Sequence, residues 1–180
     1  MNQILTALLR SHPTEEATWR AIYDQYLPQV FHYMCYKVGN VQIAEDLTAI
    51  TFEKAWKSKH HFQKSKGAVQ SWIFGIARHV VVDHFRKPCR EESLECLAET
   101  HSNSPSVEEE VQKSQEFEII FRIIQLFPKR DKEIIALKYG AELTNRKIAV
   151  MTGLSETNIG TILNRLVSKI RLEMRGKDER

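Results

Sequence analysis

The stretch from Thr144 to Arg171, TNRKIAVMTGLSETNIGTILNRLVSKIR, predicts two helices joined by a tight turn. Thr144 can cap the first helix. Gly153 can end it, because glycine readily adopts the left-handed backbone conformation that a helix terminus needs. Ser155 can then cap the second helix by accepting a hydrogen bond from a free backbone N–H group. This stretch favours a helical fold for the C-terminal part of the chain.

The second of these helices has two contrasting faces. On a 3.6-residue wheel, one stripe is apolar and comprises Ile159, Ile162, Leu163, Leu166 and Ile170. The opposite face carries short polar side chains and one guanidinium, from Thr157, Thr161, Asn164, Arg165 and Ser168. An ordinary amphipathic helix on a small core is one interpretation, but a merely solvated face usually carries more Glu and Lys. We therefore favour a DNA-binding helix-turn-helix, whose second helix enters the major groove and meets base edges.

Composition favours an all-α protein that does not enter a membrane. The 180 residues are 42% hydrophobic and include only seven glycines and five prolines among long stretches of helical period. No apolar run approaches the roughly 18 residues of a membrane-spanning helix, and we expect no signal peptide because the first residues show no cleavage pattern. The three cysteines, Cys35, Cys89 and Cys96, are irregularly spaced, which favours a reducing compartment and hence the cytoplasm.

The uneven distribution of charge predicts two domains and a linker. Residues 1–87 carry a net charge of +4, residues 88–127 carry −6 and residues 128–180 carry +5. Two basic blocks that can meet phosphates therefore flank an acidic connector that phosphates would repel. We predict an N-terminal helical domain over 1–88, a flexible acidic linker over 89–110 and a C-terminal helix-turn-helix domain over 111–180.

Helical periodicity sets the expected elements. The N-terminal part should contain helices over about 15–38, 41–59 and 68–87, with Pro28 either kinking or dividing the first. After the linker a helix should run from about Val111 to Phe127, and Pro128 should open the next one at its first turn.

The third expected helix and the loop before it form a basic strip beside aromatic side chains. Lys64 and Lys66 precede the helix, Arg78 and Arg86 lie on it opposite its core side, and Lys87 is at its end. Bases stack on aromatic rings while Lys and Arg follow phosphates, so the pattern suits single-stranded nucleic acid. For Phe74 we favour an ordinary core position. For Trp72 a core position and a base-stacking position are both open.

No enzyme signature appears in the sequence. It contains no Gly-rich phosphate loop, no HExxH motif and no nucleophile elbow, and its seven histidines are scattered. Cys89, Cys96 and His101 match no common zinc spacing and lack a fourth ligand. We therefore expect no catalytic residues, no metal site and no cofactor.

Four motifs in order resemble the extracytoplasmic-function (ECF) sigma factors of bacterial RNA polymerase, over about Trp19 to Arg171. AEDLTAITFEKAW (Ala44 to Trp56) resembles the polymerase-clamp-binding helix of that family, and SWIFGIARHVVVDHFRK (Ser71 to Lys87) its helix that reads the minus-ten element. LFPKRDKEIIALKY (Leu126 to Tyr139) and GLSETNIGTILNRL (Gly153 to Leu166) resemble its minus-thirty-five domain.

The resemblance implies a promoter-specificity subunit whose partners are core RNA polymerase and promoter DNA. Members of this family are often bound by an anti-sigma factor, so the resemblance also implies an anti-sigma factor as a candidate partner. The polymerase-binding residues implied are Asp46, Thr51, Phe52, Glu53 and Trp56. Those implied for the minus-ten element are Lys64, Lys66, Ser71, Trp72, Arg78, His79, Arg86 and Lys87. Those implied for the minus-thirty-five element are Arg146, Lys147, Thr157, Asn158, Thr161, Asn164, Arg165, Ser168 and Lys169.

The chain departs from the family pattern at a few of these motif positions. Ala49 and Ile50 stand where the family usually has Gln-Glu, and His79 stands in place of a usual Asn. Gly160 and Ile162 occupy positions that are often Lys and Arg. By resemblance, these changes bear on promoter preference more than on the overall assignment.

Two other classes of function remain open from the sequence. One is a stand-alone helix-turn-helix regulator with a helical effector or dimerisation domain, and the other is a helical adaptor that binds proteins through the acidic linker. The N-terminal half discriminates between them and a sigma factor. An effector domain has no need of a basic loop leading into a basic aromatic helix, and a repressor normally supplies a symmetric dimer interface.

Overall fold

The computed structural model describes residues 15–59, 62, 68–86 and 119–178, and within these ranges every regular element is a helix. The first three helices are α2 (Glu15–Val38), α3 (Val41–Ser58) and α4 (Val69–Arg86). The later elements are α6 (Lys129–Ile135), the π-helical turn η3 (Ala136–Gly140), α7 (Asn145–Thr152) and α8 (Glu156–Asp178). Residues 119–125 are also helical. The all-α prediction is confirmed.

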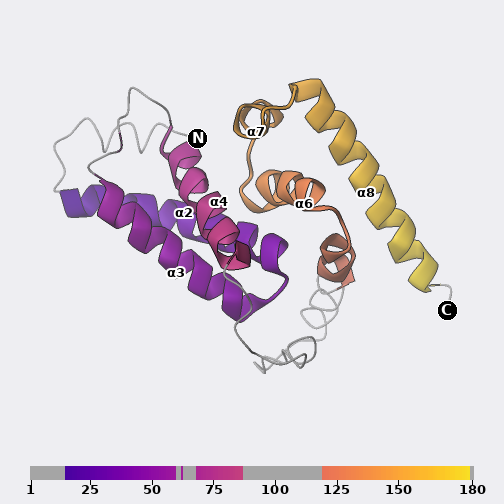
Figure 1. Cartoon of the computed structure of the whole chain (residues 1–180), viewed down its shortest axis with the longest axis horizontal. Coiled ribbons are helices and arrows are strands. Elements are labelled where there is room, and N and C mark those ends of the chain that lie inside the picture. The colour runs from indigo at the N-terminus through magenta and orange to yellow at the C-terminus, as the bar shows by residue number, and fades with distance from the viewer. Residues whose placement is uncertain (1–14, 60–61, 63–67, 87–118, 179–180) are drawn as a thin grey trace.

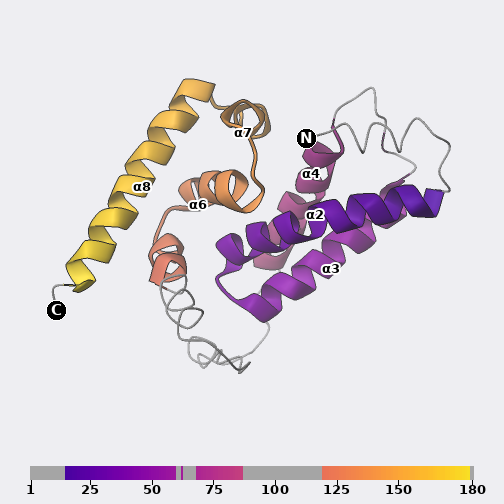
Figure 2. The ribbon, with the colours of Figure 1, turned by 180° about the vertical axis from the view of Figure 1, so that it is seen from behind.

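Helix α2 is the central element. It runs without a break through Pro28, which is exposed, so of the two alternatives left open by the sequence Pro28 does not divide this helix. It packs against α3 and α4 and also against α6 and η3. Figures 1 and 2 show the consequence: α6 lies between the first three helices and α8, which is farthest from them.

The buried side chains form one hydrophobic cluster that draws on both predicted domains. Tyr33 of α2 is fully buried and meets Phe74 of α4 edge to face, with ring centroids 5.6 Å apart. Phe74 is thus a core aromatic, as favoured from the sequence. Tyr36 of α2 contacts Phe121 from the later part of the chain, with centroids 5.1 Å apart. The two sets of helices therefore share a core.

A glycine allows the closest approach between the two sets. A Cβ atom built at Gly140, the last residue of η3, would lie 2.7 Å from both the Cα and the N of Tyr33. Atoms cannot approach that closely, and the obstacle is backbone of α2, which cannot rotate away as a side chain can. The packing of η3 on α2 therefore depends on the missing side chain at Gly140.

The predicted linker, 89–110, lies outside the described residues, so the proposed domain boundaries stay predictions. Among the residues that the structure covers, no helix is both long enough and apolar enough to cross a membrane.

Candidate nucleic-acid interface

The turn between α7 and α8 is built by the three residues expected from the sequence. Thr144 caps α7, its Oγ1 accepting a hydrogen bond from the backbone N–H of Lys147 at 3.3 Å. Gly153 ends α7 with φ 74°, in the left-handed region. Ser155 Oγ accepts from the backbone N–H of Asn158 at 3.2 Å in the first turn of α8. Local hydrogen bonding thus sets where α8 begins.

Helix α8 presents the expected two faces. Its inner side is buried at Ile159, Ile162, Leu163 and Leu166, and Ile170 is half-buried. Its outer side is exposed at every predicted position, namely Thr157, Asn158, Thr161, Asn164, Arg165, Ser168 and Lys169. A polar face of seven exposed side chains on one helix can reach base edges and phosphates of a duplex.

The guanidinium of Arg165 forms an ion pair with a buried carboxylate. Its Nη2 lies 3.1 Å from Oδ2 of Asp131 on α6, and the other oxygen of Asp131 lies 3.1 Å from Nε of Arg130. The Asp131 side chain is only 7% exposed, whereas that of Arg165 is 61% exposed. One donor of Arg165 is therefore engaged inside the protein and the rest of its guanidinium faces solvent. Sequence reasoning missed Asp131, because nothing in the linear pattern pairs it with a residue 34 positions later.

The two basic residues predicted on α7 have different surroundings. Arg146 is exposed. Lys147 instead points to the first set of helices, where its Nζ donates to Oε1 of Gln70 on α4 at 2.6 Å. Nε2 of Gln70 donates in turn to the carbonyl of Ala141, at 3.2 Å.

The predicted minus-ten residues on α4 are divided among several environments. Ser71 and Trp72 are half-buried, and the Trp72 ring lies 5.1 Å from that of Phe62, centroid to centroid. His79 and Arg86 are exposed, and Arg86 pairs with Asp83 at 3.1 Å. Lys64, Lys66 and Lys87 lie outside the described residues.

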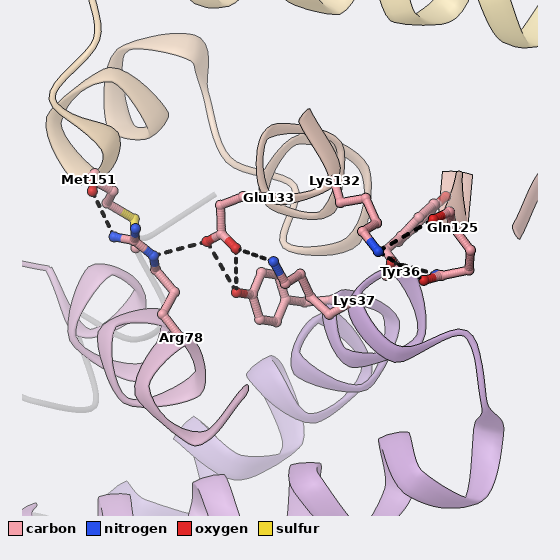
Figure 3. A network of polar contacts seen from close by, with 8 residues as sticks. Tyr36, Lys37, Arg78, Gln125, Lys132, Glu133 and Met151 are labelled. Carbon is pink, nitrogen blue, oxygen red and sulfur yellow. Dashed lines mark hydrogen bonds and ion pairs between the residues drawn. The ribbon is translucent and has the colours of Figure 1, made fainter. Parts of the chain in front are cut away.

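Arg78, which was predicted to hold the DNA backbone, is engaged within the protein. Its Nε lies 2.9 Å from Oε1 of Glu133 on α6, and its Nη1 donates to the carbonyl of Met151 on α7 at 2.6 Å. Figure 3 shows Arg78 reaching from its helix toward both partners. In this conformation, the donors used in these two contacts are not available to a phosphate.

Glu133 is the centre of this polar network. Besides Arg78, it accepts hydrogen bonds from Lys37 Nζ at 2.6 Å and from the Tyr33 hydroxyl, which lies 3.1 Å and 3.2 Å from its two oxygens. Figure 3 shows Arg78 and Lys37 both directed at Glu133. The Glu133 and Lys37 side chains are 15% and 10% exposed. Burial, and then the neighbouring Glu133 carboxylate, raise the pKa of Tyr33 well above its usual value, so the phenol stays protonated and remains a donor.

The predicted polymerase-binding residues on α3 fall into two groups. Asp46, Glu53 and Trp56 are exposed. Thr51 and Phe52 are buried: Thr51 Oγ1 donates to the carbonyl of Leu47 at 2.7 Å, and the Phe52 ring packs against Trp19 and Tyr23. In this conformation Asp46, Glu53 and Trp56 can contact a partner. Thr51 and Phe52 instead contribute to the packing of α3 within the protein.

The residues that the structure describes contain no cluster of three or more His, Cys, Asp or Glu side chains that could hold a metal ion. Cys89, Cys96 and His101 lie outside the described residues. The candidate interface consists of exposed polar and basic helix faces, which can recognise a partner by hydrogen bonds and charge.

Comparison with known proteins shows similarity to sigma factors of bacterial RNA polymerase. The family profile of Sigma-70 region 2 matches residues 22–90. Over 162 residues the chain is 27% identical to the ECF RNA polymerase sigma factor RpoE of Cereibacter sphaeroides, covering 90% of this chain and 87% of that protein. Over 155 residues it is 25% identical to the ECF RNA polymerase sigma factor SigM of Bacillus subtilis, covering 83% and 91% of the two chains.

Two solved structures share the fold. One is the sigma factor RpoE in complex with the anti-sigma factor NepR from Bartonella quintana, with a TM-score of 0.66 and 18% identity, covering 87% of this chain and 96% of that one. The other is CnrH in complex with the cytosolic domain of CnrY, with a TM-score of 0.64 and 14% identity, covering 97% of each chain.

Proposed function

We propose that this chain, which belongs to the ECF type of bacterial RNA polymerase sigma factor, directs core RNA polymerase to a set of promoters and helps to open them. The observation that carries the proposal is similarity along nearly the whole chain to ECF sigma factors of two bacteria. As an initiation factor it supplies recognition and leaves RNA synthesis to the polymerase, in the bacterial cytoplasm.

The exposed face of α8 is the proposed reader of the minus-thirty-five element. Its short polar side chains suit the major groove, and Arg146 and Lys169 are exposed at positions from which they can meet phosphates. On α4, Trp72 and His79 are the described candidates for the minus-ten strand. On α3, Asp46, Glu53 and Trp56 form the exposed part of the proposed contact with the polymerase.

The free protein should bind duplex promoter DNA poorly. The C-terminal block carries a net charge of only +5, so it makes few phosphate contacts, and each contact weakens with salt with a slope of about −0.9 in log–log terms. Core polymerase can act as a scaffold that presents both DNA-binding parts at the spacing of the promoter, which raises their effective concentration.

The test is footprinting together with permanganate detection of unpaired thymines, at about 150 mM salt, with and without core polymerase. Specific protection and strand opening should appear only when core polymerase is present. Tight, palindromic protection by the protein alone would contradict the proposal and favour a stand-alone helix-turn-helix regulator.

An anti-sigma factor is a proposed further partner. Two proteins of the same fold were solved bound to other chains, one of which is named as an anti-sigma factor. Co-purification of the tagged chain from its own host, followed by inhibition of transcription by the captured protein, tests this partner.

A further inference from the structure

His79 lies on the outer face of α4, and a contact of its ring determines which ring nitrogen carries the hydrogen. Its Nδ1 lies 2.7 Å from the carbonyl oxygen of Gly75, one turn earlier on the same helix. A carbonyl oxygen can only accept a hydrogen bond, so Nδ1 is the nitrogen that carries the hydrogen. The neutral imidazole has a single N–H, so the other nitrogen, Nε2, has a lone pair and no hydrogen. His79 therefore presents an acceptor to its surroundings.

The surface around this ring is open to a large partner. His79 is exposed, and a Cβ atom built at Gly75 would find open space. Val82, about one turn later on the same face, is 59% exposed. Arg78, next to His79 in sequence, reaches instead toward α7, where its Nη1 donates to the carbonyl of Met151. Of these four residues of α4, His79 is the one whose side chain brings a hydrogen-bonding group to the outer face.

The position of His79 along α4 suits the major groove of a duplex. The aromatic pair Phe62 and Trp72, which suits unpaired bases, lies before α4 and in its first turn, whereas His79 and Val82 lie in its second half. An α-helix fits the major groove, where each base shows a distinct set of donors and acceptors. Adenine and cytosine show an exocyclic amine there, while guanine and thymine show only acceptors.

We propose that His79 reads one base pair of the minus-ten region as an acceptor only, and so selects adenine or cytosine on the strand that it contacts. This proposal rests on the proposed function. It deepens that function by naming the chemical class of base at one promoter position.

The chemistry of His79 differs from that of an asparagine, the residue usual at this place in ECF sigma factors. A carboxamide has both a donor and an acceptor, so it can pair with N6 and N7 of adenine at once. The neutral imidazole of His79 has no donor left for N7, because Nδ1 already donates to Gly75. It can accept equally from N6 of adenine or from N4 of cytosine. Guanine and thymine would set an acceptor against an acceptor and leave both unsatisfied.

The first experiment is a promoter selection with core polymerase. A library randomised over the minus-ten region is transcribed at about pH 8, where free histidine side chains are uncharged, and the productive promoters are sequenced. At one position the parent chain should select adenine and cytosine over guanine and thymine on one strand, by roughly two- to tenfold, as for one hydrogen bond. A grouping of purines against pyrimidines, or of A·T against G·C pairs, at the position that responds to His79 would overturn the proposal.

Substitutions of His79 should change the preference at that position and at no other. His79→Asn should narrow it to adenine, and His79→Arg, which has only donors, should move it to guanine on the same strand. His84→Asn is the matched control, because it makes the same replacement on the same helix. His84 lines a cavity together with Leu47 and Ile50 of α3, away from the outer face, so the preference should stay as in the parent. An unchanged preference in both His79 variants would contradict the proposal.

The second experiment removes the amine from the DNA. Adenine at the selected position is replaced by purine, which lacks the N6 amine but keeps N7, and open-complex formation with core polymerase is measured. The parent chain should lose roughly two- to tenfold, as for one hydrogen bond. His79→Ala cannot use the amine and should lose nothing further. An equal loss in both chains would assign the amine to another residue and sink the proposal.

The outcomes separate this proposal from the proposed function. If the parent chain with core polymerase opens no promoter in the library, the proposed function fails, and the proposal that rests on it fails too. If promoters open only with core polymerase but the position that responds to His79 shows no preference for adenine and cytosine, the proposed function stands and the role of His79 as an acceptor is wrong.

Discussion

At the scale of single residues, the pairing of Asp131 with Arg165 changes how α8, the proposed recognition helix, is understood. The sequence singled out Arg165 as the guanidinium on a face of short polar groups, and the structure adds a buried carboxylate beneath it. Arg has five donors in a planar fork, so one contact to Asp131 orients the plane and leaves other donors for DNA.

Arg165→Ala should reduce transcription selectively on promoters with the preferred minus-thirty-five sequence, with a cost of about 1–3 kcal/mol if Arg165 makes a bidentate base contact. Asp131→Asn should cause a smaller loss with the same promoter dependence, and no further loss in the Arg165→Ala background, because it acts through Arg165. The measurement is in vitro transcription from promoters that differ only in this element. An equal loss on every promoter would reassign Arg165 to a phosphate contact.

A second residue-scale prediction concerns Cys35, a buried free thiol on α2. Burial, and then the negative charge of Glu45, raise the pKa of Cys35 to about 11. Because the thiolate is the reactive form, Cys35 should resist alkylation by iodoacetamide at pH 8 in the native chain and react once the chain is denatured. Mass spectrometry of the peptide carrying Cys35 reads the result, and rapid labelling of the native protein would contradict it.

At the scale of elements, local chemistry made most of the helices predictable. The bounds expected for the first helix match α2, and Thr144, Gly153 and Ser155 cap and end helices as expected. These features depend on neighbours within four residues, which a sequence displays directly. The π-helical turn η3 was not predicted. Its last residue, Gly140, packs on Tyr33, more than 100 positions earlier, and a linear pattern does not display such a contact.

Replacement by alanine should change the free energy of unfolding in opposite directions at two glycines, one at the end of α7 and one within α8. Gly153→Ala should destabilise the chain by about 1 kcal/mol, because φ 74° is strained for a residue with a side chain although the surrounding space is open. Gly160→Ala should stabilise it by about 0.5–1 kcal/mol, because Gly160 lies within α8 and its nearest new neighbour would be 3.8 Å away. Chemical denaturation checks both signs in one experiment.

At the scale of the whole molecule, the sequence predicted the parts but not their packing. Each predicted domain had its own apolar stripe, and nothing in the periodicity of α2 showed that it would pack on α3 and α4 and on α6 and η3 as well. The polar network around Glu133 was hidden for a related reason. Arg78 was interpreted by its basic neighbours on α4, while its partner Glu133 belongs to a distant helix.

The shared core predicts cooperative unfolding. The parent chain should unfold in a single calorimetric transition, because helices from both parts contribute to one hydrophobic cluster. Gly140→Ala should divide this transition into two, as the parts lose their common contact. Two transitions in the parent chain would show that the shared core contributes little to cooperativity.

The network around Glu133 also has a consequence for the order of folding. Tyr33 and Lys37 meet a carboxylate that lies 100 and 96 positions later in the chain. Contacts between residues far apart in sequence form only after the intervening chain has closed into a loop, which costs conformational entropy. The helices should therefore form before this network does, and the network should be among the last contacts made during refolding.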